Sequence, residues 1–175
     1  MGFEEILLLT GERTPHADHA YLCESVAMAA KLFAAVTVEA FPMEAEEYRA
    51  LSNAGCIGVT LYQETYDPVH YEALHRWGPK RDYERRLDAP SRVLAGGMRT
   101  VGMGTLLGIS DPLFDAISLF RHAMALRHRF WQSGVSISFP RVCPQEGGYQ
   151  PPFPVSDRFL AQIIHSLFGN DHLGL

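Results

Sequence analysis

Cysteines are few in this sequence, and no stretch is long and apolar enough to be a membrane span. The 175 residues include 3 cysteines, which stand far apart at Cys23, Cys56 and Cys143. This odd, scattered set indicates no disulfide framework, so we expect a reducing, cytoplasmic compartment. The apolar run at residues 6–9 has the length of a strand, far below the roughly 18 residues that a span needs. Glutamates at positions 4–5 stand where a secretory signal peptide would have basic residues.

An excess of basic residues is also lacking. The chain has 15 Lys and Arg residues against 20 Asp and Glu residues, a formal net charge of -5. Nucleic-acid binding requires a concentrated basic surface for the phosphates, and this balance argues against it. Hydrophobic residues make up 47% of the chain, which is enough to bury one core. We therefore expect a single domain over residues 1–175, with no nucleic-acid or membrane partner.

Short apolar segments alternate with segments of helical periodicity. Strands are predicted at residues 6–9, 36–41, 57–62, 101–107 and 135–139. Helices are predicted around residues 22–33, 44–55, 82–96, 112–131 and 156–169, with a loop or helical segment at 68–78. Pro90 must kink its helix or mark the first turn. Trp131 ends an apolar stripe, and we expect it in the core.

This alternation predicts an α/β fold with a parallel sheet of about five consecutive βα units. A closed barrel of eight such units takes about 250 residues. The chain is therefore either an open doubly wound sheet or part of a barrel. We expect each strand to be apolar on both faces, as in a sheet covered by helices. The pattern alone leaves the two architectures open.

Polar residues and glycines follow the predicted strands. In βα folds the carboxyl ends of the strands form one rim, where ligands bind. Glu12 and Glu64 suit an ammonium group or ribose hydroxyls, and Arg86 and Arg141 suit carboxylates. Glycines such as Gly104 let the backbone approach a flat ligand closely. This inventory favours an amino-acid-like or nucleoside-like ligand, although strands also end in polar residues simply because the chain reaches water there.

Several longer motifs make the sequence similar to a known enzyme family. They are residues 8–12 (LLTGE), 58–66 (GVTLYQETY), 78–80 (GPK), 86–87 (RL), 101–111 (VGMGTLLGISD) and 136–141 (SISFPR). Together they resemble the 2-iminoacetate synthases, the radical SAM tyrosine lyases of thiamine thiazole biosynthesis. The resemblance extends over nearly the whole chain in one order. It implies a radical SAM (β/α) barrel, the second of the two architectures.

The resemblance also implies a reaction. Enzymes of this family use a [4Fe-4S] cluster to reduce S-adenosylmethionine to a 5′-deoxyadenosyl radical, which initiates cleavage of the Cα–Cβ bond of tyrosine. The products are dehydroglycine and p-cresol, and dehydroglycine passes to thiazole synthase. We therefore expect tyrosine as substrate and thiazole synthase as a possible protein partner. The hydrogenase-maturation tyrosine lyase is the alternative within this enzyme class.

The resemblance further assigns roles to residues of the rim. Thr10, Gly11 and Glu12 match the motif that holds the amino group of S-adenosylmethionine. Arg86 matches the arginine that pairs with the cofactor's carboxylate, and Gly104 lies in the strand expected beside the adenine. The predicted cofactor-binding residues are Thr10, Gly11, Glu12, Glu39, Glu64, Arg86 and Gly104. The predicted substrate-binding residues are Gln63, Thr65, Ser138 and Arg141, with Arg141 expected to pair with the tyrosine carboxylate.

The sequence departs from the family at the iron–sulfur cluster. The family holds its cluster with a Cys-x3-Cys-x2-Cys loop after the first barrel strand, and this sequence contains no such motif. We expect that the first strand with its loop and the last strands are absent, and that the chain alone is inactive. It would then be a fragment of an enzyme, or a non-catalytic remnant or assembly module. The strands at 6–9 and 135–139 would have unpaired edges, so we expect the isolated chain to associate.

Overall fold

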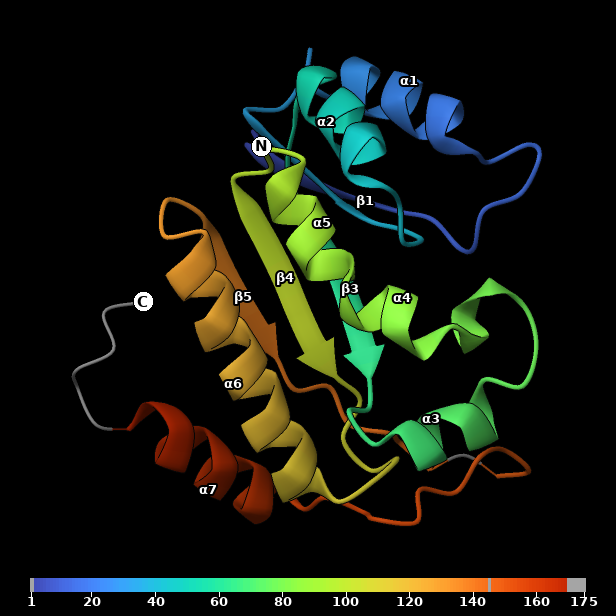
Figure 1. Ribbon diagram of the computed structural model, residues 1–175, viewed down its shortest axis with the longest axis vertical. Coiled ribbons are helices and arrows are strands. Elements are labelled where there is room, and N and C mark those ends of the chain that lie inside the picture. Colours follow the sequence, from blue (N-terminus) through green and yellow to red (C-terminus); the bar gives the residue numbers. More distant parts are fainter. Residues whose placement is uncertain (1, 145, 170–175) are drawn as a thin grey trace.

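The computed structural model describes residues 2–144 and 146–169. Within these ranges five strands alternate with helices in the predicted order (Figure 1). The strands are β1 (Glu5–Leu9), β2 (Ala35–Glu39), β3 (Cys56–Glu64), β4 (Thr100–Thr105) and β5 (Gly134–Ser138). The helices are α1 (His19–Ala29), α2 (Ala45–Asn53), α3 (Pro68–Leu74), the 3-10 turn η1 (Pro79–Arg81), α4 (Tyr83–Leu87), α5 (Ala89–Ala95), α6 (Pro112–Arg129) and α7 (Asp157–Phe168). No helix in the described ranges has the length and apolar character needed to cross a membrane.

Capping residues and prolines set the helix boundaries. Asp111 caps α6 by accepting hydrogen bonds from the N–H groups of Leu113 and Phe114, both at 2.9 Å. Residues 82–96 form two helices rather than one, because Pro90 lies in the first turn of α5 and α4 has already ended. Of the two predictions for Pro90, the first-turn position is confirmed.

The strands form a parallel sheet in the order β1-β2-β3-β4-β5. Because successive strands are neighbours and their crossovers share one hand, the crossover helices fall on the same face. Figure 1 shows α1, α2, α5 and α6 on one side of the sheet. A doubly wound sheet would reverse its strand order and carry helices on both faces. The structure therefore confirms a partial (β/α) barrel, with a sheet that does not close within the described residues.

The hydrophobic core lies between the sheet and these helices. Alternate strand residues point toward it, and buried residues of the helices meet them. The cluster includes Leu22 and Val26 of α1, Val36 and Val38 of β2, Leu51 of α2, Val59 of β3, Val93 of α5, Val101 and Met103 of β4, and Leu119 of α6. Burial of one such side chain contributes about 1.5–3 kcal/mol. This one layer therefore fixes the helices against the sheet.

The opposite face of the sheet is more polar than expected. Strand pairing aligns Leu9 with Glu39, Glu39 with Thr60, and Thr60 with Gly102. These residues alternate with the core residues and lie on the face without helices. The expectation that each strand is apolar on both faces is therefore wrong from β2 onward, because helices cover one face only. On β1 the apolar pattern leaves Leu7 and Leu9 49% and 68% exposed.

Trp131 is 78% exposed, so its predicted place in the core is wrong. α6 ends before Trp131, and the chain then turns into β5. The helix buries Ala116, Leu119 and Ala123, whereas Ile117 is 42% exposed. Because apolar residues recur at helical spacing on more than one side of α6, periodicity alone does not identify the side that faces the sheet.

Candidate functional site

A cavity of about 310 Å³ lies at the carboxyl ends of β1, β2 and β3. Its lining includes Thr10, Gly11, Glu12, Glu39, Glu64 and Arg86, which are all the predicted cofactor-binding residues except Gly104. The other lining residues are Ala40, Phe41, Leu61, Tyr62 and Lys80. Parallel strands bring their carboxyl ends to one edge, which explains how residues distant in the sequence meet here. The binding roles of these residues remain predictions.

Glu64 holds two cations of this cavity. Its Oε1 lies 2.5 Å from Nζ of Lys80 and 3.4 Å from Nη2 of Arg86, and its side chain is 13% exposed. Its φ of 73° is a left-handed conformation that residues other than glycine rarely adopt. The carbonyl of Glu64 accepts hydrogen bonds from the N–H of Leu106 at 2.7 Å and from Oγ1 of Thr105 at 2.9 Å. A strained residue held by its neighbours is typical of functional sites.

Arg86 enters the cavity from α4 and is almost fully buried. Its Nε donates a hydrogen bond to the carbonyl of Tyr62 at 2.6 Å, and Nη2 donates to Glu64 at 3.4 Å. Among the described residues, no hydrogen bond uses Nη1. One edge of the guanidinium is thus anchored, and donors remain for a carboxylate in the cavity.

Glu12 and Glu39 bring two further carboxylates to the cavity. The N–H of Thr10 donates to the carbonyl of Glu39 at 2.9 Å, which continues the pairing of β1 with β2 to the cavity edge. Glu12 lies in the exposed loop beyond it. With Lys80 and Arg86, the lining has three acidic and two basic side chains, a formal net charge of -1. This balance suits a ligand that has more positive than negative charge.

Gln63 and Thr65 do not line this cavity. Gln63 is 5% exposed and adjoins a small space on the helix side of β3, where Leu61 and Leu87 also lie. Neither atom of its amide has a hydrogen-bond partner in the described structure. Thr65 is fully buried and donates to Oδ1 of Asp115 at 2.9 Å. Their predicted contact with substrate remains untested, and the structure places neither side chain among the cavity residues.

Gly104, Ser138 and Arg141 also lie apart from the cavity lining. Gly104 pairs with Ser138 at the ends of β4 and β5, on the face without helices. Arg141 is turned toward α7, where Nη1 donates to the carbonyl of Val155 at 3.0 Å and lies 2.6 Å from Oδ1 of Asp157. The predicted pairing of Arg141 with the tyrosine carboxylate therefore remains a prediction.

Lys80 and Tyr62 line the cavity and were not among the predicted site residues. Lys80 lies in η1 after Gly78, whose φ of 74° combined with a ψ of -179° is a conformation essentially restricted to glycine. Residues 78–80 could have indicated Lys80, because a glycine followed by a proline predicts a turn, and the turn sets the backbone position of the lysine after it. Tyr62 precedes the bulge that ends the pairing of β3 with β4. Nothing in the sequence pattern predicted this irregularity.

Asp115 is a third residue that sequence reasoning missed. It is fully buried at the start of α6 and accepts hydrogen bonds from Tyr66 N–H at 2.7 Å and Ser110 Oγ at 2.7 Å. Burial raises the pKa of this carboxyl, and the hydrogen bonds that it accepts oppose the shift. With Thr65, these residues tie the loop after β3 to the loop after β4 beside the cavity.

No group of three or more His, Cys, Asp or Glu residues that could hold a metal ion occurs in the part of the chain that the structure describes. Cys23, Cys56 and Cys143 are free thiols of different exposure. A [4Fe-4S] cluster requires thiolate ligands grouped around it. The described residues do not fit such a cluster, and we assign them no part in holding one.

Comparisons with known proteins show which enzymes this chain is similar to. No protein-family model matches the chain. The 2-iminoacetate synthase of Escherichia coli (strain K12) is 36% identical over 165 residues, and that of Salmonella typhimurium (strain LT2) is 34% identical over the same length. Each match covers 94% of this chain and 44% of the relative. The chain thus spans less than half the length of these relatives.

Solved structures give the same picture. A crystal structure of HydG, described as a maturase of the [FeFe]-hydrogenase, matches with a TM-score of 0.88 and 26% identity, covering 95% of this chain and 38% of that one. HydG from Carboxydothermus hydrogenoformans matches with a TM-score of 0.84 and 28% identity, covering 93% and 39%. Methylornithine synthase, with a TM-score of 0.68 and 20% identity over 95% of this chain and 48% of that one, supports the fold alone. These matches confirm the predicted partial radical SAM barrel, and in sequence the chain is similar to a little under half of a 2-iminoacetate synthase.

Proposed function

We propose that this chain forms the S-adenosylmethionine-binding part of a tyrosine lyase of the 2-iminoacetate synthase type. The observation that carries the proposal is the cavity at the ends of β1, β2 and β3, whose lining includes all the predicted cofactor residues except Gly104. The whole reaction would cleave the Cα–Cβ bond of tyrosine to dehydroglycine and p-cresol, with thiazole synthase receiving dehydroglycine. Residues 1–175 would form one domain, an incomplete barrel core.

The charges of the cavity support this ligand. S-adenosylmethionine has a sulfonium, an ammonium and one carboxylate, so it is a cation overall, whereas the lining has a formal net charge of -1. In the proposed arrangement Glu12 accepts hydrogen bonds from the ammonium, and Arg86 donates to the carboxylate. Glu39 and Glu64 accept hydrogen bonds from the ribose hydroxyls.

In the whole enzyme, S-adenosylmethionine would supply a 5′-deoxyadenosyl radical once a [4Fe-4S] cluster held by residues outside those described here reduces it. The residues of this chain would bind and orient the S-adenosylmethionine. The buried guanidinium of Arg86, fixed by the Tyr62 carbonyl at 2.6 Å, sets the position of the carboxylate end. Because the lining has one more acidic than basic side chain, an uncharged ligand would bind more weakly than a cationic one.

The hydrogenase-maturation lyase is the second candidate, and the TM-score of 0.88 shows that this chain's fold also fits HydG. Sequence identity favours the first candidate, with 34–36% to the 2-iminoacetate synthases against 26–28% to the two HydG structures. A non-catalytic remnant or assembly module would need no ligand in this cavity. The binding experiment below separates it from both enzymes.

The test is calorimetric titration of the chain with three ligands. S-adenosylmethionine should bind more tightly than S-adenosylhomocysteine, which lacks the sulfonium charge, and 5′-methylthioadenosine, which lacks the amino acid part, should bind least. Arg86→Lys should weaken binding of the first two by about tenfold and leave the third unchanged. Arg99→Lys, at the opposite end of the sheet, is the control. Equal affinity for all three ligands, or no binding, would contradict the proposal.

A further inference from the structure

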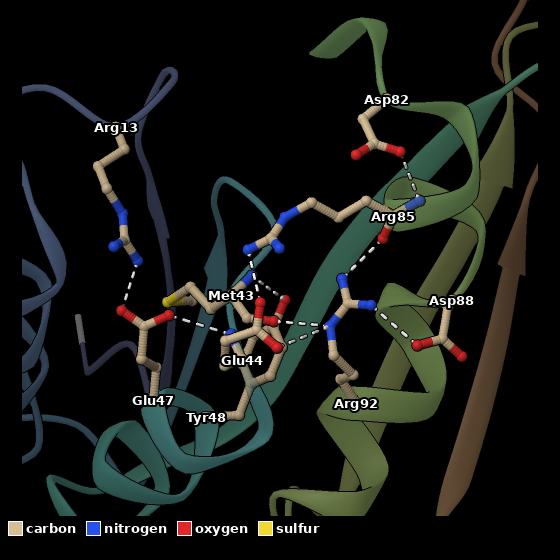
Figure 2. Close-up of polar contacts among 9 residues, drawn as sticks. All are labelled: Arg13, Met43, Glu44, Glu47, Tyr48, Asp82, Arg85, Asp88 and Arg92. Carbon is tan, nitrogen blue, oxygen red and sulfur yellow. Dashed lines mark hydrogen bonds and ion pairs between the residues drawn. The ribbon is translucent and has the colours of Figure 1, made fainter. Parts of the chain in front are cut away.

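Arg92 connects two segments that border the cavity (Figure 2). It lies on α5, and its side chain is 16% exposed. Its Nε donates to the carbonyl of Met43 at 2.9 Å, and its Nη2 donates to the carbonyl of Arg85 at 2.6 Å. Its Nη1 donates to Oδ2 of Asp88 at 2.8 Å. One guanidinium thus holds main-chain atoms of the loop after β2 and of α4.

Both carbonyls belong to segments with cavity residues. Met43 follows Phe41, which lines the cavity, by two positions, and Arg85 directly precedes Arg86. α4 contains only the 5 residues Tyr83–Leu87. A helix of that length has too few internal hydrogen bonds to hold itself in place. The orientation of Arg86 therefore depends on what anchors α4 from outside.

Exposed ion pairs around α4 are weaker anchors than Arg92. Figure 2 shows Arg85 reaching Glu44, with 2.7 Å between Nη2 and Oε1. These two side chains are 46% and 50% exposed, and ion pairs so exposed contribute little. Asp82 caps α4 by accepting from the N–H of Arg85 at 3.0 Å, which fixes its first turn only. Tyr83 and Leu87 also hold α4, through a hydrogen bond from the Tyr83 hydroxyl to the Tyr66 carbonyl at 2.9 Å and through contact of Leu87 with the core. The partly buried fork of Arg92 differs from these anchors because it binds the main chain of α4 directly before Arg86.

We propose that Arg92 is a positioning residue for the cavity: by binding the carbonyls of Met43 and Arg85 together, it holds Arg86 and Phe41 in their places. The effect on a ligand rests on the proposed function, whereas the effect on Arg86 itself does not. A planar guanidinium can hold three partners in fixed directions, and a lysine ammonium at the same place cannot reproduce this geometry. Arg92→Lys keeps the charge and the aliphatic stem, so it removes the fork alone.

The first experiment follows Arg86 without any ligand, by nuclear magnetic resonance of the isotope-labelled chain. The Nε–H signal of Arg86, identified by its loss in Arg86→Lys, should exchange slowly with water because it is buried and bonded to the Tyr62 carbonyl. Arg92→Lys should speed this exchange about tenfold. Asp88→Asn removes the charge of one exposed partner, keeps an acceptor oxygen, and should change the exchange rate by less than about twofold. Unchanged protection in Arg92→Lys would overturn the proposal.

The second experiment measures ligand affinity. Arg92→Lys should weaken S-adenosylhomocysteine about tenfold while leaving 5′-methylthioadenosine, which has no carboxylate, within about twofold. The wild-type chain should prefer S-adenosylhomocysteine to 5′-methylthioadenosine. If Arg86→Lys removes this preference and Arg92→Lys does not, the positioning role is refuted and the proposed function stands. If the wild-type chain shows no preference, the proposed function fails, and the exchange experiment decides the positioning role alone.

Folding of the variants is checked by circular dichroism and by the midpoint of urea unfolding. Arg92→Gln is the second variant, which removes the charge and keeps two donors. If both variants lose the fold, Arg92 is a structural residue and the proposal falls. If both fold and Arg86 loses its protection in each, the positioning role is supported.

Discussion

Asp115 offers the sharpest test of how the loops beside the cavity are held. Its carboxylate is fully buried and accepts hydrogen bonds from Tyr66 N–H, Ser110 Oγ and Thr65 Oγ1. The hydroxyl of Thr65 also lies 2.9 Å from Oγ of Ser110, so it keeps an acceptor without Asp115. Asp115→Ala should therefore leave two buried donors without partners, Tyr66 N–H and the Ser110 hydroxyl.

The magnitude follows from these two donors. A buried donor left unpaired costs about 1–3 kcal/mol, so Asp115→Ala should lower the free energy of unfolding by about 3 kcal/mol. With a urea slope of about 2 kcal/mol/M, the unfolding midpoint falls by about 1.5 M. Asp115→Asn keeps one acceptor oxygen for Tyr66 N–H and should lose about half as much.

The pH dependence gives a second check with a defined sign. Burial raises the pKa of Asp115 above its value in the unfolded chain, so the folded state binds a proton at this carboxyl more tightly than the unfolded state does. The contribution of this group to stability is complete below the unfolded pKa and declines as the pH rises through the folded pKa. The difference in unfolding free energy between wild type and Asp115→Asn, which cannot titrate, should therefore narrow as the pH rises above the unfolded pKa of Asp115. The proposed role of Asp115 in holding the two loops fails if Asp115→Ala costs under about 1 kcal/mol of unfolding free energy. The direction of the pKa shift is wrong if the difference between wild type and Asp115→Asn widens as the pH rises.

Three further predictions concern the surroundings of the cavity. Burial would raise the pKa of Glu47, but hydrogen bonds from Glu44 N–H and Arg13 outweigh it and lower this pKa below 4.5. Glu47→Gln should therefore cost about 1 kcal/mol of unfolding free energy at pH 7 and nothing well below pH 4. Gly104→Ala should cost about 1–3 kcal/mol in urea unfolding, because the new Cβ would lie 2.5 Å from the Tyr62 ring. Leu9→Lys should reduce association of the chain in light scattering, because Leu9 lies 68% exposed on an edge strand; a wild-type monomer at high concentration would contradict this.

The strands and the meeting of their carboxyl ends at one edge could be predicted from the sequence, because both follow from simple periodicities. Apolar runs bounded by turn residues predicted all five described strands, and parallel pairing then required their carboxyl ends to meet. This is why Glu12, Glu39 and Glu64 reach one cavity although they come from different units. The choice between a doubly wound sheet and a barrel needed the motifs as well, because helical periodicity does not say which face of the sheet a helix covers.

The direction of individual side chains was harder to predict. Residues 63–65 are consecutive, yet only Glu64 lines the cavity. In a regular strand alternate residues face opposite sides, which already separates Gln63 from Glu64. The bulge after Tyr62 and the positive φ of Glu64 then redirect the chain, and Thr65 enters the Asp115 network instead. Such irregularities depend on neighbouring strands, so one strand's own sequence does not predict them.

The glycines of β4 show that a motif shared with an enzyme family does not by itself prove contact with that family's ligand. The resemblance placed this strand beside the adenine, and close approach of a flat ligand is one reason for glycine. The structure provides another reason, because a Cβ on Gly102 would collide with Thr60 and one on Gly104 would collide with the Tyr62 ring. The space over Gly104 is therefore filled by a side chain of β3. A ligand that contacts Gly104 from this side must displace the Tyr62 ring. Packing between β3 and β4 is therefore sufficient reason for these glycines, and adenine binding beside them remains a prediction.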